Sequence, residues 1–220
     1  MKHLLLFLLL SFPALAQEPI RLCTYNVLNF SDQTSGERVA ALETVLDEIV
    51  PTILVAHELA GQIGAERFQK DVLQFVDSRL ALGAFVDGPD SDNALYVDTT
   101  RVTVVAHTPV TTSLRNLDAW TVAINGTADT LLIVGCHLKA ADDQASRDQR
   151  AAEAAVINQI LHTYTGRYEC VVAGDLNVYS SEEEAYQILT TFNTSVVVDP
   201  INKPGAWHNN EAFANRVVLE

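Results

Sequence analysis

Four short apolar runs along the chain each end in polar side chains of kinds that take part in catalysis. These ends are Thr24-Tyr25-Asn26, His57-Glu58, His137-Leu138-Lys139 and Gly174-Asp175-Leu176-Asn177. Alternate side chains of a strand share a face, so Asp175 and Asn177 should point the same way while Leu176 turns into the core. Clefts in layered α/β proteins often form where strand ends meet loops. The pattern therefore predicts one polar pocket to which all four segments contribute.

The side chains expected in this pocket suit one kind of chemistry. Glu58 and Asn26 offer hard oxygen ligands for Mg²⁺, which accepts one or two carboxylates and keeps waters for its substrate. His137 and Asn177 can donate hydrogen bonds to phosphoryl oxygens as charge builds on them, and Asp175 can orient or deprotonate a water. Electrostatic stabilisation and positioning are most of what phosphoryl transfer requires. The set therefore favours metal-assisted phosphoryl transfer, although each residue alone is ordinary at a strand end.

The four segments, taken in order, resemble the successive motifs of the endonuclease/exonuclease/phosphatase superfamily. The superfamily includes secreted deoxyribonucleases, abasic-site endonucleases, sphingomyelinases and inositol-polyphosphate phosphatases. The resemblance extends from Ile20 to Trp207, and its matching segments are Thr24-Tyr25-Asn26-Val27-Leu28-Asn29, Leu54-Val55-Ala56-His57-Glu58, His137-Leu138-Lys139-Ala140 and Gly174-Asp175-Leu176-Asn177. It implies a four-layer α/β/β/α sandwich, an α+β fold of two packed mixed sheets flanked by helices.

The resemblance also implies a role for each pocket residue. Glu58 would be the principal metal ligand, with Asn26 beside it. His137 would contact the scissile phosphate, Asp175 would align the attacking water and Asn177 would stabilise the transition state. The implied cofactor is Mg²⁺, with Mn²⁺ or Ca²⁺ as alternatives. Basic residues of the family often stand where Arg101 and Arg147 lie, and for these two a structural role is the expectation.

Two departures from the family pattern stand out. His57 occupies a position that is commonly Gln, and we expect it to be an ordinary polar neighbour of Glu58. The family's terminal Ser-Asp-His motif, which supplies a general base and a metal contact, has no counterpart after Asp199, since His208-Asn209-Asn210 does not match it. We therefore expect one or more final strands to be missing and the chain to be a fragment of a longer reading frame; the alternatives are that a partner supplies the strand or that the protein is inactive.

Hydrophobic spacing predicts alternating strands and helices. Without the resemblance, it leaves open whether there are two packed sheets or one sheet with helices on both faces. The expected strands are 20–27, 53–56, 94–97, 102–107, 119–124, 131–137 and 170–174, and the expected helices are 37–50, 65–82, 144–164 and 181–192.

The N-terminus has the features of a secretory signal peptide. Lys2 precedes an apolar run from Leu4 to Leu10, and Ala14-Leu15-Ala16 supplies the small residues of a cleavage site. We expect a signal peptide over 1–16 and one domain over 17–220, incomplete at its C-terminus. The mature protein should be secreted or periplasmic, without a transmembrane segment, and a monomer. Its cysteines are expected to be small buried residues.

The net charge of the chain limits which classes of binding partner are expected. The formal net charge is −14, from 14 basic and 28 acidic residues. Tight non-specific nucleic-acid binders neutralise phosphates with Lys and Arg, so this class is excluded. The expected partner is a phosphodiester substrate, with extracellular DNA as the first candidate because the family includes secreted nucleases. The alternatives are a phosphatase, a phospholipid-headgroup phosphodiesterase, and a non-catalytic secreted module that retains the fold.

Overall fold

A computed structural model describes residues 18–164, 169–191, 197–208 and 210–211 of the chain. The predicted signal peptide, 1–16, lies outside the described residues. Among those that are described, no helix combines the length and the apolar character that crossing a membrane requires.

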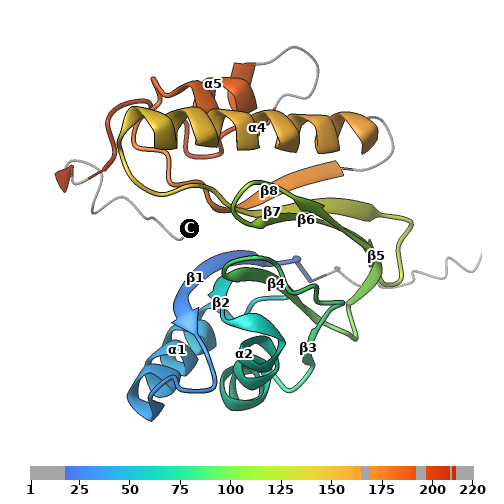
Figure 1. Ribbon diagram of the computed structural model, residues 1–220. Helices are drawn as coiled ribbons and strands as arrows, with labels where there is room; N and C mark the ends of the chain where they lie inside the picture. Colours follow the sequence, from blue (N-terminus) through green and yellow to red (C-terminus); the bar gives the residue numbers. More distant parts are fainter. Residues whose placement is uncertain (1–17, 165–168, 192–196, 209, 212–220) are drawn as a thin grey trace, which may run out of the picture.

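The first sheet is built by the N-terminal half of the chain and has the strand order β1-β2-β4-β3. Its strands are β1 (Leu22–Phe30), β2 (Ile53–Leu59), β4 (Asp92–Asp98) and β3 (Leu80–Leu82). β1 and β2 run parallel, and the other pairs are antiparallel. Its outer face is covered by α1 (Gly36–Ile49), α2 (Gly61–Phe68), η1 (Gln69–Leu73) and α3 (Gln74–Val76), which form the lowest layer in Figure 1.

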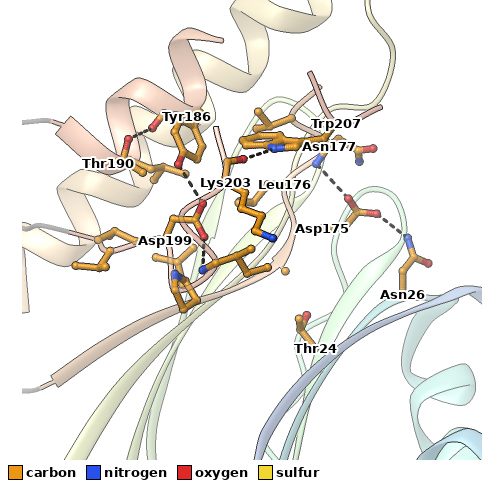
Figure 2. A pocket seen from close by; sticks show the side chains of 18 of the residues that line it. Thr24, Asn26, Asp175, Leu176, Asn177, Tyr186, Thr190, Asp199, Lys203 and Trp207 are labelled. Carbon is orange, nitrogen blue, oxygen red and sulfur yellow. Dashed lines mark hydrogen bonds between the residues drawn. The ribbon is translucent and has the colours of Figure 1, made fainter. Parts of the chain in front are cut away.

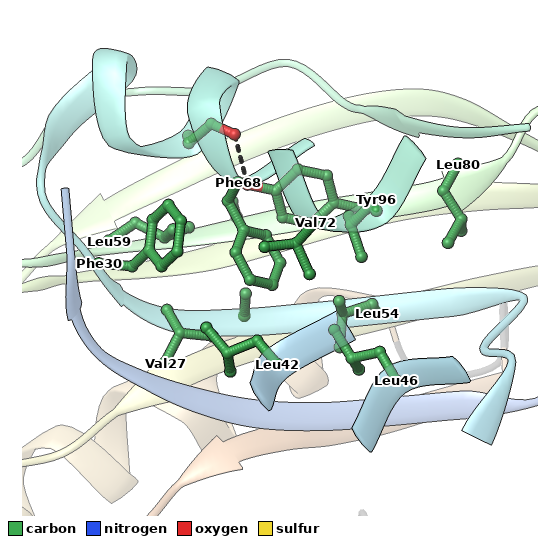
Figure 3. Close-up of a cluster of buried hydrophobic side chains, with 14 residues drawn as sticks. Val27, Phe30, Leu42, Leu46, Leu54, Leu59, Phe68, Val72, Leu80 and Tyr96 are labelled. Atoms are coloured by element: carbon green, nitrogen blue, oxygen red, sulfur yellow. Dashed lines mark hydrogen bonds between the residues drawn. The ribbon is translucent and has the colours of Figure 1, made fainter. Parts of the chain in front are cut away.

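A hydrophobic cluster joins these helices to the first sheet (Figure 3). Leu42 and Leu46 recur on one side of α1, and Phe68 of α2 lies edge-on to Phe30, with ring centroids 5.1 Å apart. Each such side chain stabilises the fold by roughly 1.5–3 kcal/mol when fully buried. Burial of Leu42 and Leu46 therefore fixes α1 against the sheet.

The second sheet has the strand order β5-β6-β7-β8. Its strands are β5 (Val102–Thr111), β6 (Asn116–Ile124), β7 (Thr130–His137) and β8 (Glu169–Asp175). The first three are antiparallel neighbours, whereas β7 and β8 are parallel and are connected through α4 (Gln144–Tyr164). Helices α4 and α5 (Glu184–Thr191) cover the outer face of this sheet and form the top layer in Figure 1.

The two sheets pack face to face through a separate apolar cluster. Ile53 and Val55 of β2 and Leu95 of β4 meet Trp120 and Ile133 of the second sheet. Both faces of each sheet are thus covered, as the near-continuous apolar strands required. The predicted four-layer α/β/β/α sandwich is confirmed.

Three expectations about local structure were wrong. The helix expected over 65–82 ends with α3 at Val76, and Leu80 belongs to β3. Asp77 adopts an extended backbone, and its Oδ1 accepts a hydrogen bond from the backbone N–H of Arg79 at 2.9 Å, a local bond that competes with the helix. The last helix begins at Glu184 rather than at Ser181, whose hydroxyl accepts instead from the N–H of Gly205.

The third concerns the cysteines. Cys136 is buried as expected, but Cys23 is half-buried and Cys170 is exposed. Cys170 is exposed because β8 is an edge strand. In the described part of the chain no strand pairs with the outer edge of β8, nor with that of β1 in the other sheet.

Candidate active site

Two carboxylates from different sheets meet at the side chain of Asn26. Asn26 lies on β1, Glu58 on β2 and Asp175 at the end of β8. Asn26 Nδ2 donates to Glu58 Oε1 at 2.8 Å and to Asp175 Oδ2 at 3.1 Å, and Figure 2 shows the second of these bonds. Residues far apart in sequence thus converge as predicted, and an amide N–H group carrying partial positive charge lies between the two acids.

Irregular backbone at the ends of β1 and β2 directs these side chains. The pairing of β1 with β2 shifts register between Asn26 and Phe30. Leu28, Asn29 and Glu58 have φ values of 51°, 50° and 62°, a region that non-glycine residues seldom occupy. Asn29 N–H donates to Glu58 Oε2 at 3.1 Å, and Leu28 N–H donates to Asn26 Oδ1 at 2.9 Å. Such irregularities re-aim side chains near functional sites.

Gly174 allows β8 to approach β7 where the site forms. A Cβ atom at Gly174 would lie 1.9 Å from the carbonyl oxygen of Cys136, so no other residue fits here. Beyond it, Asn177 N–H donates to Asp175 Oδ1 at 3.1 Å, and Asn177 Nδ2 donates to the carbonyl of Leu138 at the same distance. Asn177 therefore joins the segments that follow β7 and β8.

His137 completes the cluster from the end of β7. Its Nε2 lies 3.8 Å from Glu58 Oε1, and its side chain is buried. Its Nδ1 is buried without a hydrogen-bond partner among the described residues. Burial, and then the positive charge of Arg115, lower the pKa of His137 below its ordinary value of 6.5. The imidazole is therefore neutral at pH 7.

Sequence reasoning missed two arginines that shape this site. Arg115 forms an ion pair with Asp90 at 2.9 Å and donates weakly to the carbonyl of His137 at 3.5 Å. Fully buried Arg150 of α4 donates through NH1 to the carbonyls of Lys139 and Ala141, at 2.8 and 2.6 Å. The only available signal for Arg115 was its place in the turn before a predicted strand, and Arg150 was hidden within an amphipathic helix.

Arg150 also holds the segment that follows β8. Its Nε and NH2 donate to Glu183 Oε2 at 3.0 and 2.9 Å.

The two arginines singled out in the sequence make contacts that suit the structural role expected of both. Arg101 donates to Thr52 Oγ1 at 3.0 Å, and Arg147 pairs with Asp142.

A cavity of about 660 Å³ opens beside the cluster. Thr24 and Asn26 of β1 and Asp175 of β8 line one side, and apolar or aromatic side chains of α5 and of 197–207 line the other. In Figure 2, Lys203 points into this space, and Tyr186 and Trp207 lie along its wall. The cavity is therefore predominantly apolar but adjoins the two carboxylates.

His57, expected to be an ordinary polar neighbour, is fully buried and bonded at both nitrogens. Its Nε2 lies 2.7 Å from Thr24 Oγ1 and its Nδ1 lies 2.8 Å from Asn93 Oδ1. Burial lowers the pKa of His57 to about 4. The side chain hydrogen-bonds to Thr24 and Asn93 and not to the acids.

The donors fit a divalent ion of the kind that keeps much of its water. No group of three or more His, Cys, Asp or Glu side chains among the described residues is arranged to hold a metal. The carboxylate of Glu58 and the amide oxygen of Asn26 instead offer two hard oxygen donors, with the carboxylate of Asp175 beside them, and this chemistry matches Mg²⁺ better than Zn²⁺. The amide N–H that now lies between the acids marks where positive charge is favourable.

The first residue of β4, Asp92, carries a pH-sensitive carboxyl. Burial, together with the nearby charge of Asp87, raises the pKa of Asp92 to about 6. A carboxyl whose pKa is raised by folding contributes stability at a pH below its pKa in the unfolded chain. This contribution is lost as the pH rises through about 6, the pKa of Asp92 in the folded protein. Asp87→Asn should therefore raise the melting temperature at pH 8 but not at pH 5. The gain in the free energy of unfolding should stay below about 1 kcal/mol, because Asp87 is exposed and its charge is screened by solvent.

Differential scanning calorimetry at both pH values checks this prediction. Asp47→Asn, which changes the net charge equally on the exposed side of α1, is the matched control. Equal gains in the two variants would mean that net charge, and not the carboxyl pair, sets the effect.

Comparison with known proteins supports the fold. No protein-family model and no curated protein sequence matches the chain. Among solved structures, a humanized TDP2 of D. rerio matches with TM-score 0.60 at 18% identity, covering 76% of this chain and 66% of that one. The human Nocturnin catalytic domain with bound sulfate gives 0.61 at 18%, covering 79% and 70%.

A third match is an endonuclease/exonuclease/phosphatase family protein from Bacteroides thetaiotaomicron, with TM-score 0.59 at 13% identity, covering 77% of this chain and 67% of that one. The chain thus spans about two thirds of the length of the solved chains that it matches. The layers of the chain, its strand order and its likeness to these structures all indicate the same fold. The chain has the fold of the endonuclease/exonuclease/phosphatase superfamily.

Proposed function

We propose that this protein is an exported, divalent-metal-dependent phosphodiesterase of the nuclease type. The observation that carries the proposal is the meeting of Glu58 and Asp175, from different sheets, on the amide of Asn26 with His137 beside them. Nothing in the packing of the sandwich requires two acids to lie this close, because both could reach solvent at the strand ends. A cation bound beside the two acids explains the arrangement.

Glu58 and Asn26 would hold the metal ion. A divalent ion there supplies Lewis-acid polarisation of a phosphoryl oxygen and stabilises the leaving oxygen. Asp175, fixed by the N–H of Asn177, would orient the attacking water and accept its proton. Neutral His137 would donate one hydrogen bond to a phosphoryl oxygen, and Asn177 would donate another through its amide as charge develops. These are positioning and electrostatic contributions, which suit an in-line displacement.

Two features bear on the substrate. Among the structural neighbours, D. rerio TDP2 is complexed with single-strand DNA product and Nocturnin holds a sulfate anion, which favours phosphodiester hydrolysis on a nucleic acid. The apolar cavity beside the acids and the net charge of −14 favour a second candidate, a small phosphodiester or phospholipid headgroup carrying an apolar group. Export is proposed from the N-terminal sequence alone.

The test is hydrolysis by the purified protein, expressed from its complete reading frame. Plasmid DNA and bis(p-nitrophenyl) phosphate serve as substrates, with Mg²⁺ or with EDTA. We expect hydrolysis that requires Mg²⁺ and is abolished by EDTA. Hydrolysis unaffected by EDTA would refute the metal mechanism. No hydrolysis with Mg²⁺, Mn²⁺ or Ca²⁺ would favour a non-catalytic module that retains the fold.

A further inference from the structure

A chain of buried polar side chains runs between the two sheets beside the candidate active site. It links Thr24 of β1, His57 of β2, Asn93 of β4, Asp118 of β6 and His107 of β5. Asn93 Nδ2 lies 2.9 Å from Asp118 Oδ2, and His107 Nε2 lies 2.7 Å from Asp118 Oδ1. We call the four residues Thr24, His57, Asn93 and Asp118 the cross-sheet chain, and His107 extends it within the second sheet.

The direction of every hydrogen bond in this chain is determined. Asn93 Nδ2 faces two acceptors, Asp118 Oδ2 and the carbonyl of Asn116 at 3.0 Å, so Asn93 Oδ1 must face His57. His57 Nδ1 therefore carries the proton and donates. In a neutral imidazole the other nitrogen, Nε2, is then an acceptor, and the Thr24 hydroxyl lies 2.7 Å from it and can donate. One tautomer and one amide orientation satisfy the whole chain.

The burial of this chain makes it an unusual element of the interface between the sheets. His57, Asn93 and Asp118 are 0%, 5% and 2% exposed. Each buried polar group left without its partner costs roughly 1–3 kcal/mol, so the chain stabilises only the one arrangement that satisfies all its members. Apolar packing, such as Trp120 against Ile53 elsewhere in this interface, is far less directional. The chain thus specifies how the sheets lie relative to each other.

That alignment matters because the candidate site is divided between the sheets. Asn26 and Glu58 belong to the first sheet, whereas His137 and Asp175 belong to the second. His57 directly precedes Glu58, and its ring lies 6.5 Å from that of His137 across the interface. A small slide of one sheet would separate the two halves of the site without disturbing either.

We propose that the cross-sheet chain is a positioning device that aligns the metal-binding half of the site with the phosphate-binding half. This inference rests on the proposed function. Its members need not touch substrate, and they act through the residues that they hold in place. A misplacement of about 1 Å can lower a rate by roughly 10²-fold, which is the scale of effect at stake.

The experiment compares Asn93→Leu with Asn158→Leu in the full-length protein. Asn158 of α4 is the matched control, because its Nδ2 donates to the carbonyl of Ile188 at 2.7 Å, away from the interface between the sheets. Both variants should lose stability. Only Asn93→Leu should lose kcat, by about 10- to 100-fold. Its half-saturating Mg²⁺ concentration should change little, since Asn26 and Glu58 lie on the same sheet.

A conservative variant supplies the rescue. His57→Gln keeps one donor for Asn93 and one acceptor for Thr24, so it should retain most of the kcat that His57→Leu loses. Equal losses of kcat in the two His57 variants would overturn the positioning role. So would a folded Asn93→Leu variant whose kcat lies within about twofold of the wild type, because displaced groups should lower kcat far more than that.

A second readout does not need activity. Imidazole ¹⁵N spectra of the wild type should show His57 as the Nδ1-protonated tautomer, and Asn93→Leu should shift the resonances of His137 on the opposite sheet, whereas Asn158→Leu should not. An inactive wild type with these shifts would sink the proposed function and leave the alignment intact. Unshifted His137 resonances in Asn93→Leu would sink the alignment.

Discussion

Glu58→Gln is expected to lower kcat/KM by at least about 10²-fold and to abolish stimulation by Mg²⁺, since several kcal/mol of charge stabilisation depend on holding the ion and each 1.4 kcal/mol is tenfold in rate. Glu58 supplies one of the two carboxylates at Asn26 and accepts from Asn26 Nδ2 and Asn29 N–H through different oxygens. In Gln, one of those oxygens becomes an NH₂ group that faces a donor. The variant therefore loses both the charge and the geometry.

The measurement is steady-state hydrolysis of bis(p-nitrophenyl) phosphate over a range of Mg²⁺ concentrations. Glu66→Gln is the control, because Glu66 is an exposed acid of α2 that accepts from Gln62 at 2.7 Å. It should leave the kinetics unchanged. A Glu58→Gln variant that still responds to Mg²⁺ as the wild type does would place the ion elsewhere.

Asp175→Asn should cost a comparable factor, about 10²–10³-fold in kcat, by analogy with the loss of one preorganised group at a transition state. The carboxylate accepts from Asn26 Nδ2 and from the N–H of Asn177, which leaves its remaining acceptor capacity for a water. An amide cannot take the proton of that water at neutral pH. The loss should therefore fall on kcat, while KM changes little.

Asp199→Asn offers a control from the same cavity. Asp199 accepts from Tyr186 Oη at 3.0 Å and from the N–H of Ile201 at 2.9 Å, away from the acids at Asn26. Figure 2 shows the two aspartates on different walls. Activity close to that of the wild type is expected for Asp199→Asn. If both aspartate variants lose activity equally, the effect belongs to the cavity as a whole and not to Asp175.

The convergence of the candidate site could be predicted from sequence because its polar residues stand out at the ends of apolar runs. Asn26, Glu58, His137 and Asp175 each lie where an apolar run ends, and the ends of these strands meet at one edge of the two packed sheets. Periodicity alone could not choose between one sheet and two, and the resemblance made that choice. The longest helix, Gln144–Tyr164, was predicted with its bounds intact because its spacing is regular over 21 residues.

What the sequence hid are the contacts between residues distant along the chain. Asp118 lies 25 positions from Asn93, and Glu183 lies 33 positions from Arg150. Neither pair has a local pattern, since a buried polar residue in a strand looks like an exposed one until its partner is known. The partners of His57, Thr24 and Asn93, could not be predicted for this reason. The end of the helix before Leu80 was missed because a side-chain bond at Asp77 outweighed the spacing of the apolar residues.

The outer edges of β1 and β8, which pair with no strand among the described residues, bear on how the protein behaves when it is concentrated. Exposed backbone N–H and C=O groups on an edge strand can pair with another molecule. The net charge of −14 opposes such encounters, but salt weakens this repulsion beyond about 8 Å at physiological ionic strength. We therefore expect the protein to stay dispersed at higher concentration in dilute buffer than in concentrated salt.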